Sequence, residues 1–187
     1  SFLLENKRIE DEVVVLFDSK NGTNTVEEYL RSHSVNGEFI WHKKDFEGHF
    51  ADWKNYLTSL CDGDFIFQID ADEYPDTYLL SVLPAILEEN TETDVFLVPR
   101  INEVIGIQQS HLGQWGWNMS DKGWINFPDY QTRILRNIPE INWHNKVHEV
   151  VKGHKKFAPL PANEEYCLWH PKEITRQEIQ NKFYETL

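Results

Sequence analysis

Three carboxylates follow one apolar run in the segment Phe65-Ile-Phe-Gln-Ile-Asp-Ala-Asp-Glu73, and they are Asp70, Asp72 and Glu73. The run predicts a buried strand, and in open α/β sheets ligands bind where strands end. Carboxylates so close together repel one another, and a divalent cation such as Mg²⁺ or Mn²⁺ relieves the repulsion with hard oxygen ligands. Such a cation could bridge to a phosphate-bearing substrate. A solvated acidic turn that caps the next helix has the same spacing, so the motif alone leaves both interpretations open.

The composition excludes some classes of partner. The chain has 187 residues, enough for one domain with a core, and a formal net charge of -13. A surface this acidic repels phosphate backbones, so we expect no nucleic-acid partner. No apolar run approaches the ~20 residues that span a bilayer, and no signal peptide is visible at the start.

Only two cysteines occur, Cys61 and Cys167, and neither has a metal-type spacing. They indicate a reducing compartment and no disulfide framework. We therefore expect a cytoplasmic protein, with peripheral attachment to a membrane and assembly into a homo-oligomer left open. Aromatic residues make up 13% of the chain and include seven Trp, which predicts either a core rich in rings or a site that stacks flat ligands.

The first hundred residues alternate between strand-like and helix-like segments. Continuous apolar runs predict buried strands, and apolar residues three or four apart predict helices. This alternation favours a largely parallel sheet with helices on its faces. The amino-acid composition changes near residue 100, after which Trp residues lie among Gly, Asn and Asp. We interpret this change as a change of role within one domain. The expected strands are 12–17, 38–41, 65–69, 94–99, 130–136 and 146–152, and the expected helices are 23–32, 49–60, 77–89 and 171–187.

Four segments together resemble a known family. The stretch from Asn55 to Glu73 resembles family-2 glycosyltransferases of the GT-A fold, whose pattern is a basic residue and Asn on a helix, a Gly-Asp turn, an apolar strand and then Asp-Ala-Asp-Glu, the DXD motif. Lys54 and Asn55 stand at the basic-Asn positions. The later segments are similar to the bacterial branch of the family that decorates lipopolysaccharide cores. The resemblance extends from residue 12 to 172, and its other parts are the segments 12–23, 127–137 and 143–149.

The resemblance implies a GT-A fold, which is the three-layer α/β sandwich of nucleotide-diphospho-sugar transferases with a mostly parallel, Rossmann-like sheet. It implies one domain over residues 1–187, in which 1–100 bind the nucleotide sugar, 101–170 face the acceptor and 171–187 form a terminal helix. The family opens with a further strand and turn that form part of the pocket for the base. Because only a short segment precedes Glu12, we expect this first strand to be missing.

The activity that the resemblance implies is the transfer of a sugar from a nucleotide-diphosphate donor to a hydroxyl group. We expect a UDP-hexose donor, a glycan or glycolipid acceptor, and inversion by a single displacement. Without the resemblance, Asp18 is interpreted as a turn residue and Lys54 as a surface lysine. The residues that the resemblance implies for nucleotide-sugar binding are Asp18, Lys54, Asp70 and Ala71.

Asp72 is the ligand that the resemblance implies for the metal, and in some GT-A enzymes a downstream His is a further ligand. The chain offers His148 in Lys146-Val-His-Glu149 and His170 in Leu168-Trp-His-Pro171. An imidazole ligand suits Mn²⁺ better than Mg²⁺. His148 lies in the more family-like segment and ranks first, although a lone His is more often a structural hydrogen-bonding residue.

Transfer also needs a base for the acceptor hydroxyl and a surface for the acceptor sugar. Asp129 and Glu149 are the candidates for the base, although Asp129 also fits a turn after Pro128. Indole rings stack on the apolar CH faces of sugars, which predicts an acceptor wall, but the same rings could instead pack a loop onto the sheet. The candidate rings are Trp115, Trp117 and Trp124.

Two other functions remain open. A metal-dependent phosphohydrolase would use the same acidic cluster, but it usually needs a further carboxylate for a second metal. A nucleotide-sugar-binding module without activity would result from an incomplete donor pocket. Transfer of a labelled sugar to an added acceptor separates the transferase from both. The sequence does not decide the donor sugar or the acceptor.

Overall fold

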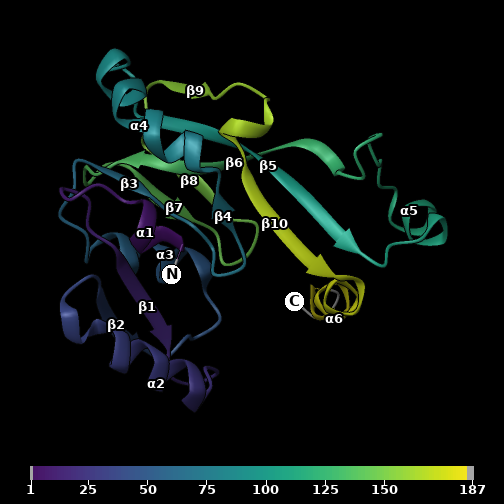
Figure 1. Cartoon of the computed structure of the whole chain (residues 1–187), viewed down its shortest axis with the longest axis horizontal. Coiled ribbons are helices and arrows are strands. Elements are labelled where there is room, and N and C mark those ends of the chain that lie inside the picture. Colours follow the sequence, from purple (N-terminus) through teal and green to yellow (C-terminus); the bar gives the residue numbers. More distant parts are fainter. Residues whose placement is uncertain (1, 185–187) are drawn as a thin grey trace. The chain divides into compact units, whose positions relative to one another are not determined.

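The computed structural model of the chain describes residues 2–184 (Figure 1). Within this range no helix is both long enough and apolar enough to cross a membrane. The helices are α1 (Phe2–Asn6), α2 (Asn24–His33), α3 (Phe50–Thr58), α4 (Thr77–Glu89), α5 (Gln109–Trp115) and α6 (Ile174–Tyr184). The strands are β1 (Val14–Asp18), β2 (Ile40–Lys44), β3 (Phe65–Phe67), β4 (Tyr74–Pro75), β5 (Val95–Ile105), β6 (Ile125–Arg136), β7 (Asn142–His144), β8 (Val150–Lys152), β9 (Phe157–Pro159) and β10 (Leu168–Glu173).

The chain folds into two compact units that interleave along the sequence. Strands β5 and β6 each contribute residues to both units. The expected segments 1–100 and 101–170 do not coincide with these units, and their separate roles stay a prediction. The first unit consists of the residues up to 67 with 92–95 and 134–157, and the second consists of 68–91, 96–133 and the residues from 158 onward.

The first unit contains the parallel pair β1 and β2. Their register runs from Val14 opposite Ile40 to Asp18 opposite Lys44. Helix α2 begins after Thr23, whose side chain caps the first turn, so the strand and helix predicted for this segment are confirmed. Apolar side chains from the strands and the helix bury one another, and the buried members of this cluster are Phe17, Leu30 and Phe39.

The second unit contains β10 and all of β5 after Val95, and these two strands pair in parallel. It also contains β4, which pairs antiparallel with β10. Strand β10 leads directly into α6, so the end of β10 and the first turn of α6 are adjacent (Figure 1). Helix α6 lies within the helix expected over 171–187, of which residues 185–187 lie outside the described range. One of the core clusters of this unit has the buried members Ile101, Trp124 and Cys167.

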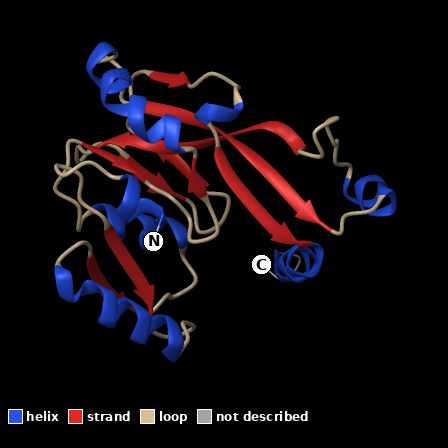
Figure 2. Cartoon of the chain, in the orientation of Figure 1, coloured by secondary structure: helices blue, strands red, loops and turns tan. Residues whose placement is uncertain are grey.

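The expected mostly parallel GT-A sandwich is wrong. The largest sheet is mixed and has the order β3-β6-β5-β10-β4, with β9 beside β5, while β1-β2 and β7-β8 form two separate two-stranded sheets (Figure 2). Strand β3 pairs antiparallel with β6, and β7 pairs antiparallel with β8. Alternating strands and helices predicted parallel crossovers between successive strands. The neighbour of β3 is instead the long strand β6, because an apolar strand pattern does not determine which later strand supplies the pairing partner.

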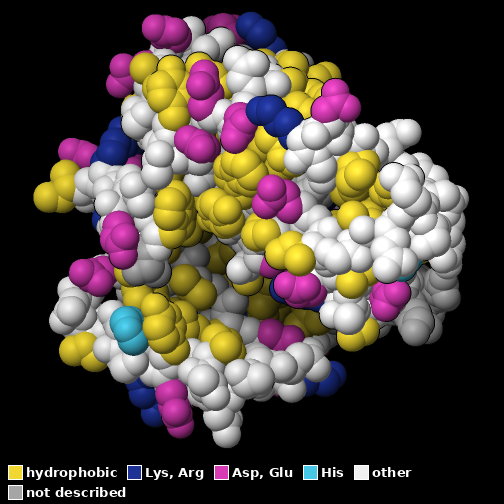
Figure 3. Space-filling model, turned by 45° about the vertical axis from the view of Figure 1, so that its right-hand side comes forward, with side chains coloured by type: hydrophobic (Ala, Val, Ile, Leu, Met, Phe, Trp, Pro, Cys, Tyr) yellow, Lys and Arg dark blue, Asp and Glu magenta, His cyan; other side chains and the backbone are white. Residues whose placement is uncertain are grey.

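On the face shown in Figure 3, Asp and Glu side chains lie scattered among apolar and uncharged groups and do not gather in one patch. This distribution accompanies the formal net charge of -13. A net negative charge disfavours long-range attraction of polyanions.

Both cysteines are free thiols. Burial, together with the charges of Glu12 and Asp62, raises the pKa of Cys61 to about 11. Burial and the charges of Glu164 and Asp76 raise the pKa of Cys167 to about 12. Since the thiolate is the nucleophile and metal ligand, neither cysteine is suited to such chemistry at neutral pH.

Asp76 caps helix α4, which follows the acidic turn. Its Oδ1 accepts a 2.8 Å hydrogen bond from the Tyr78 backbone N–H. We expect Asp76→Ala to lower the free energy of unfolding by about 1 kcal/mol, because a helix N–H in the first turn loses its acceptor. Asp76→Asn, which can still accept, should retain most of the stability. Urea unfolding measures both variants, and an equal loss in the two would contradict the capping role.

Candidate metal centre

The carboxylates of the acidic turn have different partners, all within the second unit. The turn is closed by hydrogen bonds from the Asp70 N–H to Glu73 Oε2 (3.2 Å) and from the Glu73 N–H to the Asp70 carbonyl oxygen (2.9 Å). Asp70 forms an ion pair with Arg133, whereas Asp72 lies beside His170. The two aspartates therefore do not converge on one shared partner.

Glu73 is a buried anchor of this turn. Its Oε1 accepts hydrogen bonds from Arg100 Nη1 (2.9 Å) and Arg133 Nη2 (2.6 Å), and its side chain is 0% exposed. Arg133 also donates to Asp70 Oδ2 at 2.6 Å. These pairs hold the turn against β5 and β6, a structural role for Glu73. Asp70 is thus engaged with Arg133 while Ala71 is exposed, and their contacts with a donor stay a prediction.

Asp72 meets a side chain from β10 and another from α6. Its Oδ2 lies 3.4 Å from His170 Nε2 and 3.0 Å from Arg176 Nη2. The interaction with His170 lowers the pKa of Asp72 well below its usual range; burial opposes this shift and the charge of Arg176 adds to it. The carboxylate is therefore ionised at neutral pH. The structure brings together two of the residues predicted as metal ligands, Asp72 and His170.

The distance between Asp72 and His170 matches both a direct ion pair and two ligands of one divalent cation. Ligand atoms about 2.1 Å from one cation lie about 3.0–3.4 Å apart at octahedral or tetrahedral angles. Asp72 Oδ2 and His170 Nε2 are 3.4 Å apart. Among the residues that the structure describes, no group of three or more His, Cys, Asp and Glu side chains could hold a metal. A cation between Asp72 and His170 would have to take its remaining ligands from phosphate or water oxygens.

His148, the other predicted metal ligand, belongs to the first unit and lies between β7 and β8. Its φ is 53°, which is uncommon for a residue other than Gly and marks a tight turn. Its carbonyl oxygen accepts a hydrogen bond from Asn145 Nδ2 at 3.4 Å. The role of His148 as a metal ligand stays a prediction.

Asp18 closes the turn after β1 in the first unit. Its Oδ1 accepts from the backbone N–H groups of Lys20 (2.9 Å), Asn21 (3.3 Å) and Phe46 (3.1 Å). Burial raises the pKa of Asp18, but these bonds and one from the Asn21 side chain lower it overall. This geometry is that of a turn-forming aspartate, and a contact with the donor nucleotide stays a prediction.

Lys54 and Glu149 form an ion pair within the first unit. Lys54 Nζ lies 3.1 Å from Glu149 Oε1 and 4.3 Å from the centre of the Trp143 ring. The neighbouring Asn55 holds the Trp143 backbone, donating to its carbonyl oxygen and accepting from its N–H, both at 2.8 Å. The segments that resemble the family at Asn55 and Trp143 are thus joined by direct contacts. Donor binding by Lys54 and base catalysis by Glu149 stay predictions.

Asp129, the first candidate for the base, is surrounded by hydrogen-bond donors in the second unit. Its Oδ2 accepts from Arg100 Nε (3.0 Å), Arg100 Nη2 (2.7 Å) and Asn102 Nδ2 (2.8 Å). Its Oδ1 accepts from Gln131 Nε2 at 2.8 Å. Burial raises the pKa of Asp129, but the charge of Arg100 and these hydrogen bonds lower it overall. A lowered pKa weakens a general base, so the geometry suits a structural role better, while the base role itself stays a prediction.

The three candidate acceptor rings lie in different surroundings. Trp124 is buried against Phe127, with ring centres 4.9 Å apart, and this contact matches the alternative that the ring packs a loop. Trp115 and Trp117 are half-buried at the end of α5, with ring centres 4.8 Å apart. Trp115 also stacks on His111. Trp115 and Trp117 thus present more open indole surface than Trp124, and their contact with an acceptor stays a prediction.

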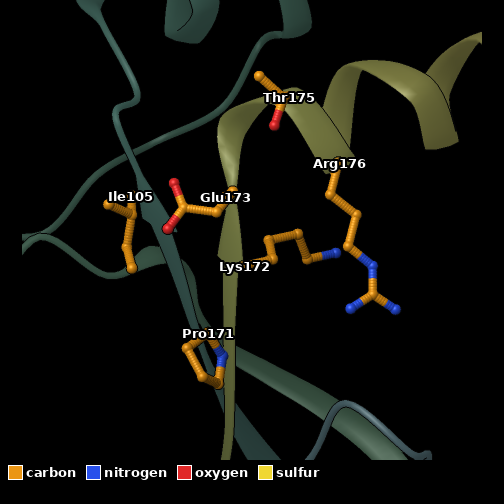
Figure 4. Close-up of a pocket in the computed structure, with 6 residues that line it drawn as sticks. All are labelled: Ile105, Pro171, Lys172, Glu173, Thr175 and Arg176. Carbon is orange, nitrogen blue, oxygen red and sulfur yellow. The ribbon is translucent and has the colours of Figure 1, made fainter. Parts of the chain in front are cut away.

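Two cations beside Asp72 were missing from the sequence prediction. Lys172 at the end of β10 and Arg176 in α6 extend to the same side of the chain (Figure 4). Burial lowers the pKa of Lys172, with Asp72 opposing this shift and Arg100 adding to it. These two residues line a surface hollow of about 400 Å³, whose other lining residues are Ile105, Pro171, Glu173 and Thr175 (Figure 4).

No protein-family model matches the sequence, and no curated protein matches it significantly. A function must therefore be inferred from the side chains of the chain and from the segments that resemble family-2 glycosyltransferases. Within the second unit, a carboxylate, an imidazole and two cations meet at the end of β10. This combination suits a divalent cation together with a phosphate group, because hard anionic oxygens are attracted to both.

Proposed function

We propose that the chain is a metal-dependent glycosyltransferase that moves a sugar from a nucleotide-diphosphate donor, UDP-hexose, to a hydroxyl of a glycan or glycolipid. The observation that carries the proposal is the placement of Asp72 beside His170, with Arg176 3.0 Å from the same carboxylate. A donor diphosphate needs both a cation bridge and further positive charge as it leaves. Both kinds of group are present in this one unit.

Each residue has a defined role in this proposal. Asp72 and His170 would hold Mn²⁺ or Mg²⁺, which would supply positive charge beside the departing diphosphate. Arg176 is largely exposed, so its guanidinium can turn from Asp72 toward a phosphate without leaving a buried charge. Lys172 adds a second positive charge, and its position at the end of β10 keeps it near Asp72.

The other parts of the proposal come from the family resemblance. They include inversion by a single displacement, donor contacts by Asp18 and Lys54, and acceptor contacts by Trp115 and Trp117. A cytoplasmic location is also part of the proposal, because the two thiols carry no disulfide and the sequence has no cysteine framework.

A nucleotide screen followed by a transfer assay tests the proposal. We expect UDP with Mn²⁺ to raise the melting temperature more than UDP alone, and more than GDP, CMP or dTDP. A ligand at 100 times its Kd adds about 2.7 kcal/mol to the free energy of unfolding, enough to measure. Labelled UDP-hexose should then yield labelled acceptor.

The same assay separates the competing functions. Release of labelled hexose 1-phosphate, with no labelled acceptor across a panel of glycans and glycolipids, would favour a phosphohydrolase, because such an enzyme cleaves the diphosphate itself. UDP binding with neither product would favour a binding module. If none of the four nucleotides shifts the melting temperature, with or without Mn²⁺, the proposed donor site is wrong.

A further inference from the structure

A chain of polar contacts runs from Asp129 through Asn102 to His170 and ends at Asp72. Asn102 Nδ2 donates to Asp129 Oδ2 at 2.8 Å, and Asn102 Oδ1 lies 2.8 Å from His170 Nδ1. The other ring nitrogen of His170, Nε2, lies 3.4 Å from Asp72 Oδ2. The parallel register of β5 and β10 makes these contacts, since it sets His170 directly opposite Asn102. All four residues belong to the second unit.

Asp129 determines which atoms donate and which accept in this series of hydrogen bonds. An ionised carboxylate can only accept hydrogen bonds. Asp129 is kept ionised by Arg100, which donates to Oδ2 through Nε at 3.0 Å and Nη2 at 2.7 Å, while Gln131 donates to Oδ1. Asn102 must therefore turn its NH₂ group toward Asp129. A flipped amide would set its oxygen against the carboxylate, placing two acceptors face to face.

The orientation of Asn102 determines the proton position on His170. With its NH₂ group directed at Asp129, Asn102 presents only its carbonyl oxygen to His170, so Nδ1 must carry a proton to donate to it. Both ring nitrogens face an oxygen acceptor, but Asn102 Oδ1 is nearer, at 2.8 Å against 3.4 Å for Asp72 Oδ2. A ring with one proton therefore keeps it on Nδ1, and the lone pair of Nε2 is left for a cation between Nε2 and Asp72. His170 is only 7% exposed, so the surrounding core also restricts the ring.

We propose that Asn102 is a positioning residue that presets His170, by holding its proton on Nδ1, to offer Nε2 as a metal ligand beside Asp72. This inference rests on the proposed metal site. Metal-bound histidines commonly donate their other N–H to an oxygen acceptor, which orients the ring and sets its tautomer. The acceptor here is a neutral amide, so it orients the ring without adding a second negative charge against it. Asp129, which contacts Asn102 on the side away from His170, has its charge balanced by Arg100.

The first test reads the tautomer of His170 directly in the metal-free protein. Long-range ¹H–¹⁵N NMR of ¹⁵N-histidine-labelled chain, at a pH where the ring carries one proton, distinguishes Nδ1–H from Nε2–H. We expect Nδ1–H in the unaltered chain and a shift toward Nε2–H in Asn102→Leu, a variant of similar size without polar atoms. An Nε2–H ring in the unaltered chain overturns the proposal.

The second test measures Mn²⁺ binding by electron paramagnetic resonance of the free ion. We expect Asn102→Leu to weaken binding by about 10–100-fold, as for other residues that orient a metal ligand. The exposed Asn118 of the same unit provides the control, and Asn118→Leu should bind Mn²⁺ as the unaltered chain does. Unchanged Mn²⁺ binding in Asn102→Leu overturns the positioning role.

A second variant guards against loss of folding in Asn102→Leu. In Asn102→Asp the side chain keeps its shape, and the new carboxylate accepts from His170 Nδ1 in either orientation. We expect the Nδ1–H tautomer to persist in this variant, which a purely packing role for Asn102 would not require. An Nε2–H ring in Asn102→Asp contradicts the proposal.

These readouts also separate this inference from the proposed function. An Nδ1–H ring and Mn²⁺ binding that depends on Asn102, without any nucleotide-dependent shift in melting, would support the positioning role and reject the donor site. Sugar transfer by a chain whose His170 carries its proton on Nε2 would support the function and reject the positioning role.

Discussion

Asp72→Ala should abolish the Mn²⁺-dependent part of nucleotide binding and lower sugar transfer by about 10³-fold, equivalent to about 4 kcal/mol of transition-state stabilisation. The reason is geometric. Asp72 is the carboxylate that His170 and Arg176 both approach, so its removal leaves one protein ligand for the cation. The measurements are the transfer rate with labelled donor and the UDP-dependent melting shift with and without Mn²⁺.

The free energy of unfolding of this variant should fall at neutral pH, because the buried His170 loses the carboxylate beside it. The pair with Arg176 adds little to this loss, since Arg176 is 64% exposed and such ion pairs contribute at most about 1 kcal/mol. Asp121→Ala removes a carboxylate from an exposed turn and should transfer sugar at the unaltered rate. If Asp72→Ala still transfers sugar and still responds to Mn²⁺, Asp72 does not belong to the site.

Glu73→Gln, at the next position in the sequence, should act on stability. We expect it to lower the free energy of unfolding by about 3 kcal/mol, the lower end of the cost of breaking a buried ion pair. Glu73 is fully buried and accepts from both Arg100 and Arg133. Gln keeps the shape of the side chain but loses its charge, so two guanidinium groups keep only Asp129 and Asp70 as charged partners. Those remaining pairs keep the loss from being larger.

Urea unfolding at neutral pH measures this loss. Glu28→Gln makes the same chemical change on the exposed face of α2 and should alter the free energy of unfolding by less than about 0.5 kcal/mol. Equal midpoints for the two variants would show that the buried network of Glu73 adds nothing to stability. A stable Glu73→Gln chain would also remove the anchoring role assigned to Glu73.

The two predictions assign different roles to adjacent residues of one turn. Spacing alone groups Asp70, Asp72 and Glu73 into one acidic cluster, although the family resemblance implied donor binding for Asp70 and metal ligation for Asp72. The structure separates them by burial and by partner: Glu73 and Asp70 face arginines, and Asp72 faces His170. A function for Asp72 and a structural role for Glu73 are thus independent claims with independent measurements.

Local elements were well predicted from the sequence. Helix α4 has the predicted bounds Thr77–Glu89, and Thr23 caps α2 as expected. Helix spacing, β-branched runs and capping residues act over a few neighbouring positions, so a sequence contains their whole cause. The strand pairing was wrong for the same reason, since the pairing of β3 with β6 joins segments about 70 residues apart.

Asp72, His148 and His170 were all candidate ligands from the sequence, which ranked His148 above His170. The parallel register of β5 and β10 instead brings His170 within reach of Asp72 and opposite Asn102. No sequence pattern marked Asn102 as a functional residue, because the role of a single Asn in a strand depends on partners that the sequence does not show. The sequence by itself determined which elements form and which side chains could do chemistry at the acidic turn. Only the tertiary structure decided which of them meet, because pairing across long chain separations depends on packing that no local pattern contains.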